Sequence, residues 1–286
     1  GEKGHEGADL VAAAEKLAAR GADTLARLPA VGVLALAVAA TKSGSLAACT
    51  GAVLSAAVAE LGSWPTGDAI RLLHAATKAK GGGIPKKARS ALLRGTATAI
   101  APRLGELPAA ELVRLAIAAG GGAAVEGGDK DAGGKLLEAV AVEAGRRLSD
   151  LPQAHLLLLT QGLAPLGGGH AALRQICGYW GEVLRDDSSA ADEVTRRRKD
   201  VERGQALKGE QLVRLAAVLE PLGKGLDGET AERCFGALAA RLLPACASLP
   251  EASCTALLTQ VRRSEEVGGL GAGAVGEKLK KALERR

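Results

Sequence analysis

A leucine followed by proline, or a close equivalent of that pair, recurs along the chain at steps of 36, 43, 44, 56 and 42 residues. The six copies are Leu28-Pro29, Trp64-Pro65, Leu107-Pro108, Leu151-Pro152, Leu207-Lys208 and Leu249-Pro250. Each step is long enough for two helices and two turns, which is the length of a helical repeat unit. The spacing therefore predicts about six helix-pair repeats, each of which begins at one of these pairs.

Apolar residues follow each pair at the same three offsets. Counted from the Leu or Trp, the fifth residue on is Val33, Ala69, Leu112, Leu156, Leu212 or Cys254. The eighth is a leucine in every copy, at Leu36, Leu72, Leu115, Leu159, Leu215 and Leu257. The twelfth is Ala40, Ala76, Ala119, Leu163, Leu219 or Val261. Because these offsets share one face of a helix, we expect a first helix after each pair, with this face buried and the proline at its start.

The composition favours helices throughout. Ala, Leu and Val supply nearly all of the 47% hydrophobic fraction, whereas the chain has two Trp, one Tyr, one Phe and no Met. Strands would require more β-branched and aromatic side chains. Second helices are expected at residues 86–104, 135–148, 171–184 and 231–243. Glycine clusters, among them Gly120–Gly122, Gly133-Gly134 and Gly167–Gly169, are expected to end helices and connect them.

The predicted fold class is therefore all-α, an α-solenoid that forms a single array over residues 1–286, because no helix pair can bury its apolar face alone. The expected repeats span residues 28–63, 64–106, 107–150, 151–206, 207–248 and 249–286. Residues 1–27 are expected to form an N-terminal capping helix, and residues 185–203 a charged insertion at one edge of the array.

Motifs that carry catalytic chemistry are weak. Residues 271–276 match the GxGxxG dinucleotide-binding pattern, but that pattern needs a preceding strand, and we expect a loop between helices here. The four histidines show no metal-ligand spacing, and the five cysteines lack CxxC spacing, so buried, reduced thiols are expected. The sequence predicts no enzyme, no cofactor, no metal and no small-molecule substrate.

Arginine occupies the seventh position of the first helix in three of the six copies, at Arg71, Arg114 and Arg214. In a stacked array, equivalent positions line up on one surface. Such a row of guanidinium groups would contact phosphates or stack on bases. The alternative is a solvated helix face, with each arginine paired to an acid three or four residues earlier. Those acids are Asp68, Glu111 and Glu210.

The overall charge permits a polyanionic partner without requiring one, since the net charge is +5 and the pI is about 9.0. The most basic run of adjacent residues is Arg196-Arg197-Arg198-Lys199. This run is either a phosphate contact or a solvated loop.

The full pattern of the repeat unit is Leu-Pro, then Leu-x-x-Leu-Ala, then a second helix that ends Arg-Leu-x-x-Leu-Pro. Its clearest copies are residues 107–116 and 207–216. This pattern resembles the octotricopeptide and heptatricopeptide repeat families, which are organellar RNA-binding α-solenoids. The resemblance implies a non-catalytic RNA-binding subunit of an organellar ribonucleoprotein, with a structural component of the mitochondrial ribosome that contacts rRNA as the leading case. It also implies that Arg71, Arg114 and Arg214 face the RNA.

The alternative function is a protein–protein scaffold in another organellar assembly, such as a respiratory complex. For either function, the expected partners are components of a large complex. For the ribonucleoprotein subunit, these partners are RNA and neighbouring proteins. The expected location is the mitochondrial matrix, with the plastid as the alternative. Residues 30–40 are apolar but too short for a membrane span, so none is expected. Because the chain has no methionine, we also expect a processed form whose targeting segment has been removed.

Overall fold

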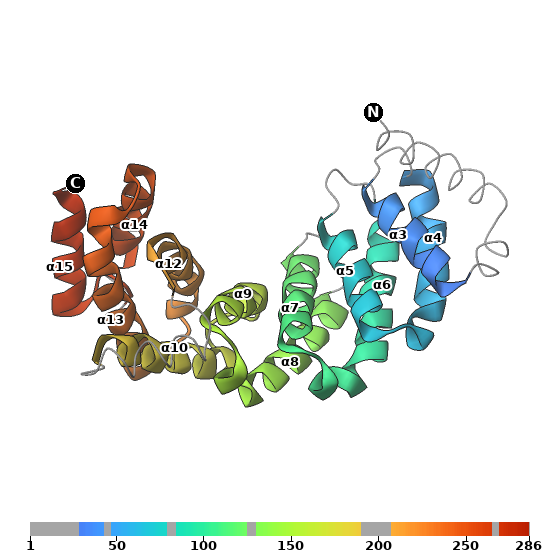
Figure 1. Cartoon of the computed structure of the whole chain (residues 1–286), viewed down its shortest axis with the longest axis horizontal. Coiled ribbons are helices and arrows are strands. Elements are labelled where there is room, and N and C mark those ends of the chain that lie inside the picture. Colours follow the sequence, from blue (N-terminus) through green and yellow to red (C-terminus); the bar gives the residue numbers. More distant parts are fainter. Residues whose placement is uncertain are drawn as a thin grey trace. The chain divides into compact units, whose positions relative to one another are not determined.

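The computed structural model describes residues 29–42, 47–78, 84–124, 130–189, 207–264 and 269–285. These residues form twelve α-helices and no strand, which confirms the all-α class (Figure 1). The chain divides into two compact units, Gly1–Glu143 and Ala144–Arg286. The predicted capping helix lies outside the described residues, as do residues 196–199 and all of the predicted insertion beyond Ser189.

The helices alternate between predicted first and second positions of a pair. The first unit contains α3 (Ala30–Lys42), α4 (Ala47–Glu60), α5 (Thr66–Lys78), α6 (Lys86–Ile100), α7 (Ala109–Ala124) and most of α8 (Lys130–Arg146). The second contains α9 (Gln153–Leu163), α10 (Ala171–Ser189), α12 (Gly209–Gly223), α13 (Gly228–Ala245), α14 (Glu251–Ser264) and α15 (Gly273–Glu284). Short 3-10 turns are η2 (Leu61–Ser63), η3 (Ala101–Glu106), η4 (Leu148–Asp150), η5 (Ala164–Leu166) and η6 (Cys246–Ser248).

Every predicted first helix begins two residues after its Leu or Trp. The residue that follows the Leu or Trp lies just outside the helix, and its carbonyl accepts the first helical hydrogen bond from the N–H four residues on. These N···O distances lie between 2.9 and 3.3 Å for Pro29, Pro65, Pro108, Pro152, Lys208 and Pro250. Proline suits this place because its missing N–H would have no helical partner there. The copy with Lys208 makes the same bond, so the position matters more than the proline.

The predicted apolar face is buried in full. All the residues at the fifth, eighth and twelfth positions of the six copies are buried, and so is every Leu or Trp of the pairs that the structure describes. Four of the latter also donate their N–H to the carbonyl three residues earlier, at 3.2–3.4 Å, in the 3-10 turns that end the preceding second helix. These four are Trp64, Leu107, Leu151 and Leu249. Each junction is thus fixed by a turn and by a buried side chain.

Within each unit, first helices pack on first helices and second helices on second helices. In the first unit α5 contacts α3 and α7, while α4 contacts α6. In the second unit α12 contacts α9 and α14, while α13 contacts α10 and α15. Each unit therefore has two layers, whose helices alternate along the chain.

One polar link in the second unit spans a long stretch of sequence. Gln153, in the first turn of α9, is 5% exposed, and its Oε1 accepts a hydrogen bond from the Leu207 N–H at 3.1 Å. The bond fixes the start of the α12 segment against α9. Between these two points lies the longest step of the repeat.

The glycine clusters were only partly interpreted correctly. Gly167 has a φ of +78° in the turn before α10, as expected of a helix connection. Gly120–Gly122, however, lies inside α7, and Gly133-Gly134 lies inside α8, so the predicted helix ends at these clusters are wrong. Glycine lowers helix stability by about 1 kcal/mol relative to alanine, and packing of the buried face outweighs that cost.

Buried thiols were predicted correctly for the four cysteines that can be assessed. Cys177, Cys234, Cys246 and Cys254 are all buried and form no disulfide. The pKa of the Cys234 thiol is raised by its hydrogen bond with the Cys177 thiol and by burial. Both effects favour the protonated thiol of Cys234, which serves as a small apolar core residue.

Candidate nucleic-acid interface

The three seventh-position arginines lie on exposed faces, as predicted. Arg71 and Arg114 belong to α5 and α7, which pack side by side in the first unit. Arg214 belongs to α12 in the second unit. The first unit therefore brings two of the three arginines onto adjacent helices of one surface.

The arginines do not share one kind of partner. Arg71 lies 3.7 Å from Asp68, but its side chain is 69% exposed, so this ion pair contributes little. Arg214 instead donates a hydrogen bond from Nη2 to Gln161 Oε1 at 2.6 Å. Arg114 makes no ion pair with a described residue. Pairing to the acid three or four residues earlier thus accounts for Arg71 only.

Arg114 and Arg214 each lie near the residue at the tenth position of the preceding helix pair, counted from the Leu or Trp of that pair. Gln161 lies ten residues after its leucine, and His74 lies ten residues after Trp64. Arg114 is near enough to His74 to lower the pKa of its imidazole, after the larger effect of burial and the effect of Lys78. The seventh position of one repeat therefore meets the tenth position of the repeat before it, through a hydrogen bond in one unit and a repulsive charge in the other.

This geometry gathers positive charge on α5 and α7. Arg71, His74 and Lys78 recur on one stripe of α5, at spacings of three and four residues, and Arg114 lies on the neighbouring helix. We call these four residues the α5–α7 stripe. The positive charges of Lys78 and Arg114 oppose protonation of His74. An anion bound at the α5–α7 stripe would reduce the repulsion among these cations, so the stripe attracts anions.

Charge along the sequence reveals a larger feature, which the search for adjacent cations missed. Between Asp68 and Glu106 the chain has no acidic residue. It has eight cations there: Arg71, Lys78, Lys80, Lys86, Lys87, Arg89, Arg94 and Arg103. We call residues 69–105 the basic segment. Since the whole chain has a net charge of +5, the residues outside the basic segment carry a net negative charge. The net charge of successive stretches of the sequence therefore distinguishes this segment from the rest of the chain.

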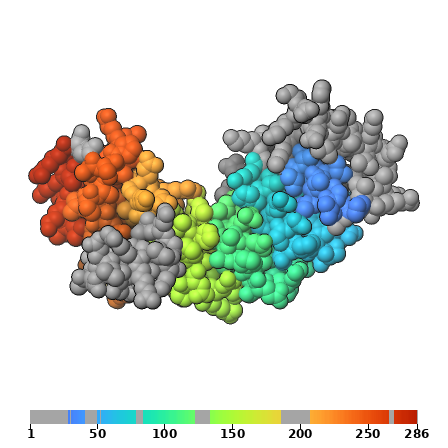
Figure 2. All heavy atoms as spheres, in the orientation of Figure 1, coloured from blue at the N-terminus to red at the C-terminus, as the bar shows by residue number. Residues whose placement is uncertain are grey.

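Helix α6 continues the positive surface. Lys86 and Lys87 are its first two residues, both exposed, and Lys78 ends α5 at the same connection. Cations at a helix start are unfavourable, because the helix dipole is already positive there. Arg94, seven residues after Lys87 and so about two turns further along the same face of α6, is also exposed. Helices α5 to α7, drawn in cyan and green, reach the surface in the view of Figure 2.

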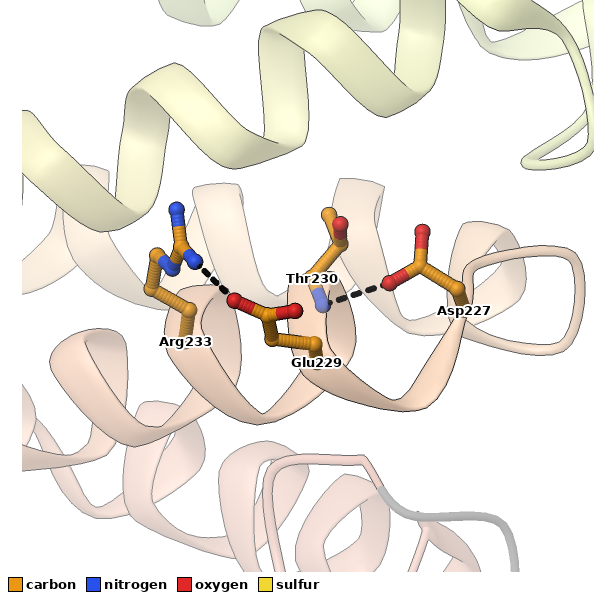
Figure 3. Close-up of polar contacts among 4 residues, drawn as sticks. All are labelled: Asp227, Glu229, Thr230 and Arg233. Atoms are coloured by element: carbon orange, nitrogen blue, oxygen red, sulfur yellow. Dashed lines mark hydrogen bonds and ion pairs between the residues drawn. The ribbon is translucent and has the colours of Figure 1, made fainter.

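The start of α13 in the second unit has the opposite character (Figure 3). Asp227 Oδ1 accepts a hydrogen bond from the Thr230 N–H at 2.9 Å and so caps the helix. This bond, with the Thr230 hydroxyl and the charge of Arg174, lowers the pKa of Asp227. Arg233 pairs with Glu229 one turn earlier, and its stem lies against Gly181 of α10. Each cation here has a nearby acid, as in an ordinary structural helix start.

The GxGxxG match lies at the start of α15, where Gly273 is the first helical residue and the preceding described residues form a turn. A β-carbon at Gly276 would come within 2.5 Å of the Gly271 carbonyl oxygen, so close packing explains this glycine. The described part of the chain holds no group of three His, Cys, Asp or Glu side chains that could bind a metal ion. Among the same residues, no helix combines the length and apolarity of a membrane span.

Comparison of the chain with models of known protein families finds no match, and comparison with curated proteins finds no detectable relative.

Proposed function

We propose that this chain is a non-catalytic, RNA-binding α-solenoid of about six helix-pair repeats, a structural subunit of an organellar ribonucleoprotein that contacts ribosomal RNA. The observation that carries the RNA partner is the basic segment, which contains eight cations and no acid, and whose described cations lie on α5, α6 and η3 of the first unit. The organelle and the ribosome rest on the resemblance of the repeat to organellar RNA-binding families.

Two observations support the repeat array. The same buried positions recur in all six copies, and each described unit stacks first helices on first helices and second helices on second helices. Stacking of this kind buries a continuous core that no single pair could bury. It also presents equivalent positions on a common surface.

Phosphate contact is the physical role that suits the basic segment. Each cation that neutralises a phosphate of a single strand releases condensed counterions, and affinity then falls with salt, with a slope of about −0.7 per contact. Arg71 and Arg114 offer planar donors for phosphate oxygens, and Lys78, Lys86 and Lys87 offer point charges at the two helix ends that the α5–α6 connection joins. The near absence of exposed aromatic side chains makes backbone contact the larger contribution.

The test is salt-dependent binding of the full chain to labelled organellar rRNA fragments. We expect sub-micromolar affinity at low salt. Reversing Lys78, Lys86 and Lys87 to Glu should weaken binding strongly and make the salt slope shallower by about 2. Reversing Arg71 and Arg114 should act in the same direction.

A matched control is available in the second unit. Arg263, Lys278 and Lys281 are exposed on α14 and α15, and their reversal to Glu changes the net charge by the same amount. If this control weakens binding as much as the basic-segment variant, attraction depends on net charge and not on the proposed surface. If the unaltered chain does not bind RNA at low salt, the proposed function is wrong.

The second candidate is the protein–protein scaffold. The observation in its favour is the near balance of cations and acids over the whole chain. It becomes the preferred function if RNA binding is absent.

A further inference from the structure

The aromatic residues of this chain are few, and they are distributed unevenly between core and surface. The sequence contains two Trp, one Phe and one Tyr, all of which the structure describes. Trp64, Trp180 and Phe235 are at most 3% exposed. Tyr179, on α10, is the one member of the four that reaches the surface. The neighbouring Trp180 is fully buried, where its Nε1 donates a hydrogen bond to Thr160 Oγ1 at 3.0 Å.

Tyr179 lines a pocket of about 320 Å³ in the second unit. One wall is the stripe of α10 formed by Gln175, Gly178, Tyr179 and Glu182, which are spaced by three, one and three residues. The other wall is the end of α8 and the turn η4, with lining residues Gly145, Arg146, Leu148 and Ser149. The pocket lies outside the basic segment and uses none of its residues.

Two glycines and one hydrogen bond shape this pocket. Gln175 Nε2 donates to the Gly145 carbonyl at 3.1 Å, and a β-carbon at Gly145 would come within 2.7 Å of Gln175 Oε1. The α8 wall and the α10 wall are therefore close together at Gly145 and Gln175, where this hydrogen bond joins them. At Gly178, by contrast, a β-carbon would meet no atom within 4 Å. The α10 wall of the pocket therefore has open space at Gly178, because this position carries no side chain.

The chemistry of the lining matches a planar base of a single RNA strand. The Tyr179 ring offers a face on which a base stacks, as bases do on aromatic side chains in single-strand binding sites. The exposed carboxylate of Glu182 accepts hydrogen bonds from base amino groups, while Arg146 donates to base carbonyls or to a phosphate. A volume near the lower limit for small-ligand sites, about 300 Å³, suits one base more than a longer ligand.

We infer that this pocket binds one unstacked nucleobase of a single-stranded RNA. The inference rests on the proposed function, and it adds contact with a base to contact with the backbone. Tyr179 supplies the stacking surface, and Gly178 supplies the space for the base.

The test compares a short, unstructured, labelled RNA with a strand of the same length whose sugars carry no bases, each bound to the full chain at low salt. We expect the RNA to bind about tenfold more tightly than the abasic strand, since one stacked base contributes an effect of this order. Tyr179→Leu should abolish that preference and leave affinity for the abasic strand unchanged. Tyr179→Phe should retain the preference, because stacking needs the ring and not the hydroxyl.

Gly178→Leu tests the pocket without removing any contact. The new side chain should fill the open space, and replacement of a helical glycine favours the helix, so folding should be preserved. We expect it to remove the preference for RNA over the abasic strand, while Gly178→Ala should retain most of it. Circular dichroism of each variant verifies the helix content.

The outcomes separate the pocket from the proposed function. If the unaltered chain binds both strands equally, or if Tyr179→Leu and Gly178→Leu both keep the preference, the pocket does not bind a base, while the role of the basic segment stands. If neither strand binds, the proposed function fails and the pocket fails with it.

Discussion

The pair α5–α6 in the first unit and the pair α12–α13 in the second have the same core and opposite surfaces. Both pairs bury the residues at the fifth, eighth and twelfth positions of the first helix. Residues 209–245 of the second pair carry five acids and four cations, whereas residues 66–100 of the first pair carry one acid, Asp68, and seven cations. Packing thus repeats along the chain, and surface charge does not. A function that depends on charge therefore belongs to one place and not to every repeat.

The two pairs also treat their cations differently. In α12–α13, Arg214 bonds to Gln161 and Arg233 pairs with Glu229, while Asp227 caps the second helix. In α5–α6, the second helix begins with two lysines and has no acid in its first turn. The start of α13 thus uses its charges to stabilise the helix, whereas the start of α6 places two cations where the helix dipole makes them unfavourable.

The largest expected effect comes from substitutions in the buried face that the two helix pairs share. Leu72→Ala and Leu215→Ala each remove a fully buried eighth-position side chain, and each should lower the free energy of unfolding by about 2–5 kcal/mol. Denaturant unfolding followed by circular dichroism measures both. Arg71→Ala and Arg214→Ala are the surface controls, with expected changes within about 0.5 kcal/mol. A small loss at only one leucine would show that the two cores are not equivalent.

A smaller effect is expected when the start of α6 is given an acidic residue, as the start of α13 has. Lys87→Glu places an acid in the first turn of α6 and should stabilise the protein by about 0.3–1 kcal/mol. The same variant should weaken RNA binding, because it removes a cation from the basic segment. Thermal unfolding and RNA titration of one preparation test both statements. If stability and affinity rise together, the lysines at this helix start do not contact RNA.

The cap of α13 should respond to pH in a defined direction. The lowered pKa of Asp227 means that its contribution to stability is present above the unfolded-state pKa and is lost as the pH falls through the folded-state pKa. Asp227→Asn should therefore be less stable than the unaltered chain at neutral pH, and the difference should shrink in acid. Unfolding curves over a pH series test this expectation, and a difference that persists in acid would contradict it.

The smallest expected effect concerns His74. Its folded-state pKa lies below the ordinary value, so the protein should lose stability as the pH falls through the ordinary imidazole range and reaches the lowered pKa. Arg114→Gln should raise the His74 pKa, but only in part, because burial has the larger effect. An NMR titration of the imidazole measures the shift. Bound RNA should raise the same pKa, and an unchanged value in the presence of saturating RNA would place the phosphates elsewhere.

The core could be predicted from the sequence because burial follows helical periodicity, which a single chain displays directly. The eighth-position leucines and the start of each first helix were predicted in this way, and both are confirmed. The end of α7 and the start of α8 were not predicted, because packing of a buried face outweighs the low helix propensity of the glycines there.

The surface was harder to predict because partners on different helices are not spaced along one helix. Arg214 contacts Gln161, more than fifty residues earlier, and not Glu210 on its own helix. The relation between seventh and tenth positions appears only when repeats are stacked. The basic segment was accessible from the sequence, but as a deficit of acids over a long window and not as a run of adjacent cations.

The bond between Gln153 and Leu207 has a consequence for how this chain can change. It holds the two ends of the longest step at a fixed separation, whatever the number of residues between them. A substitution at Gln153 therefore reaches beyond its own helix pair, because it releases the start of α12 from α9.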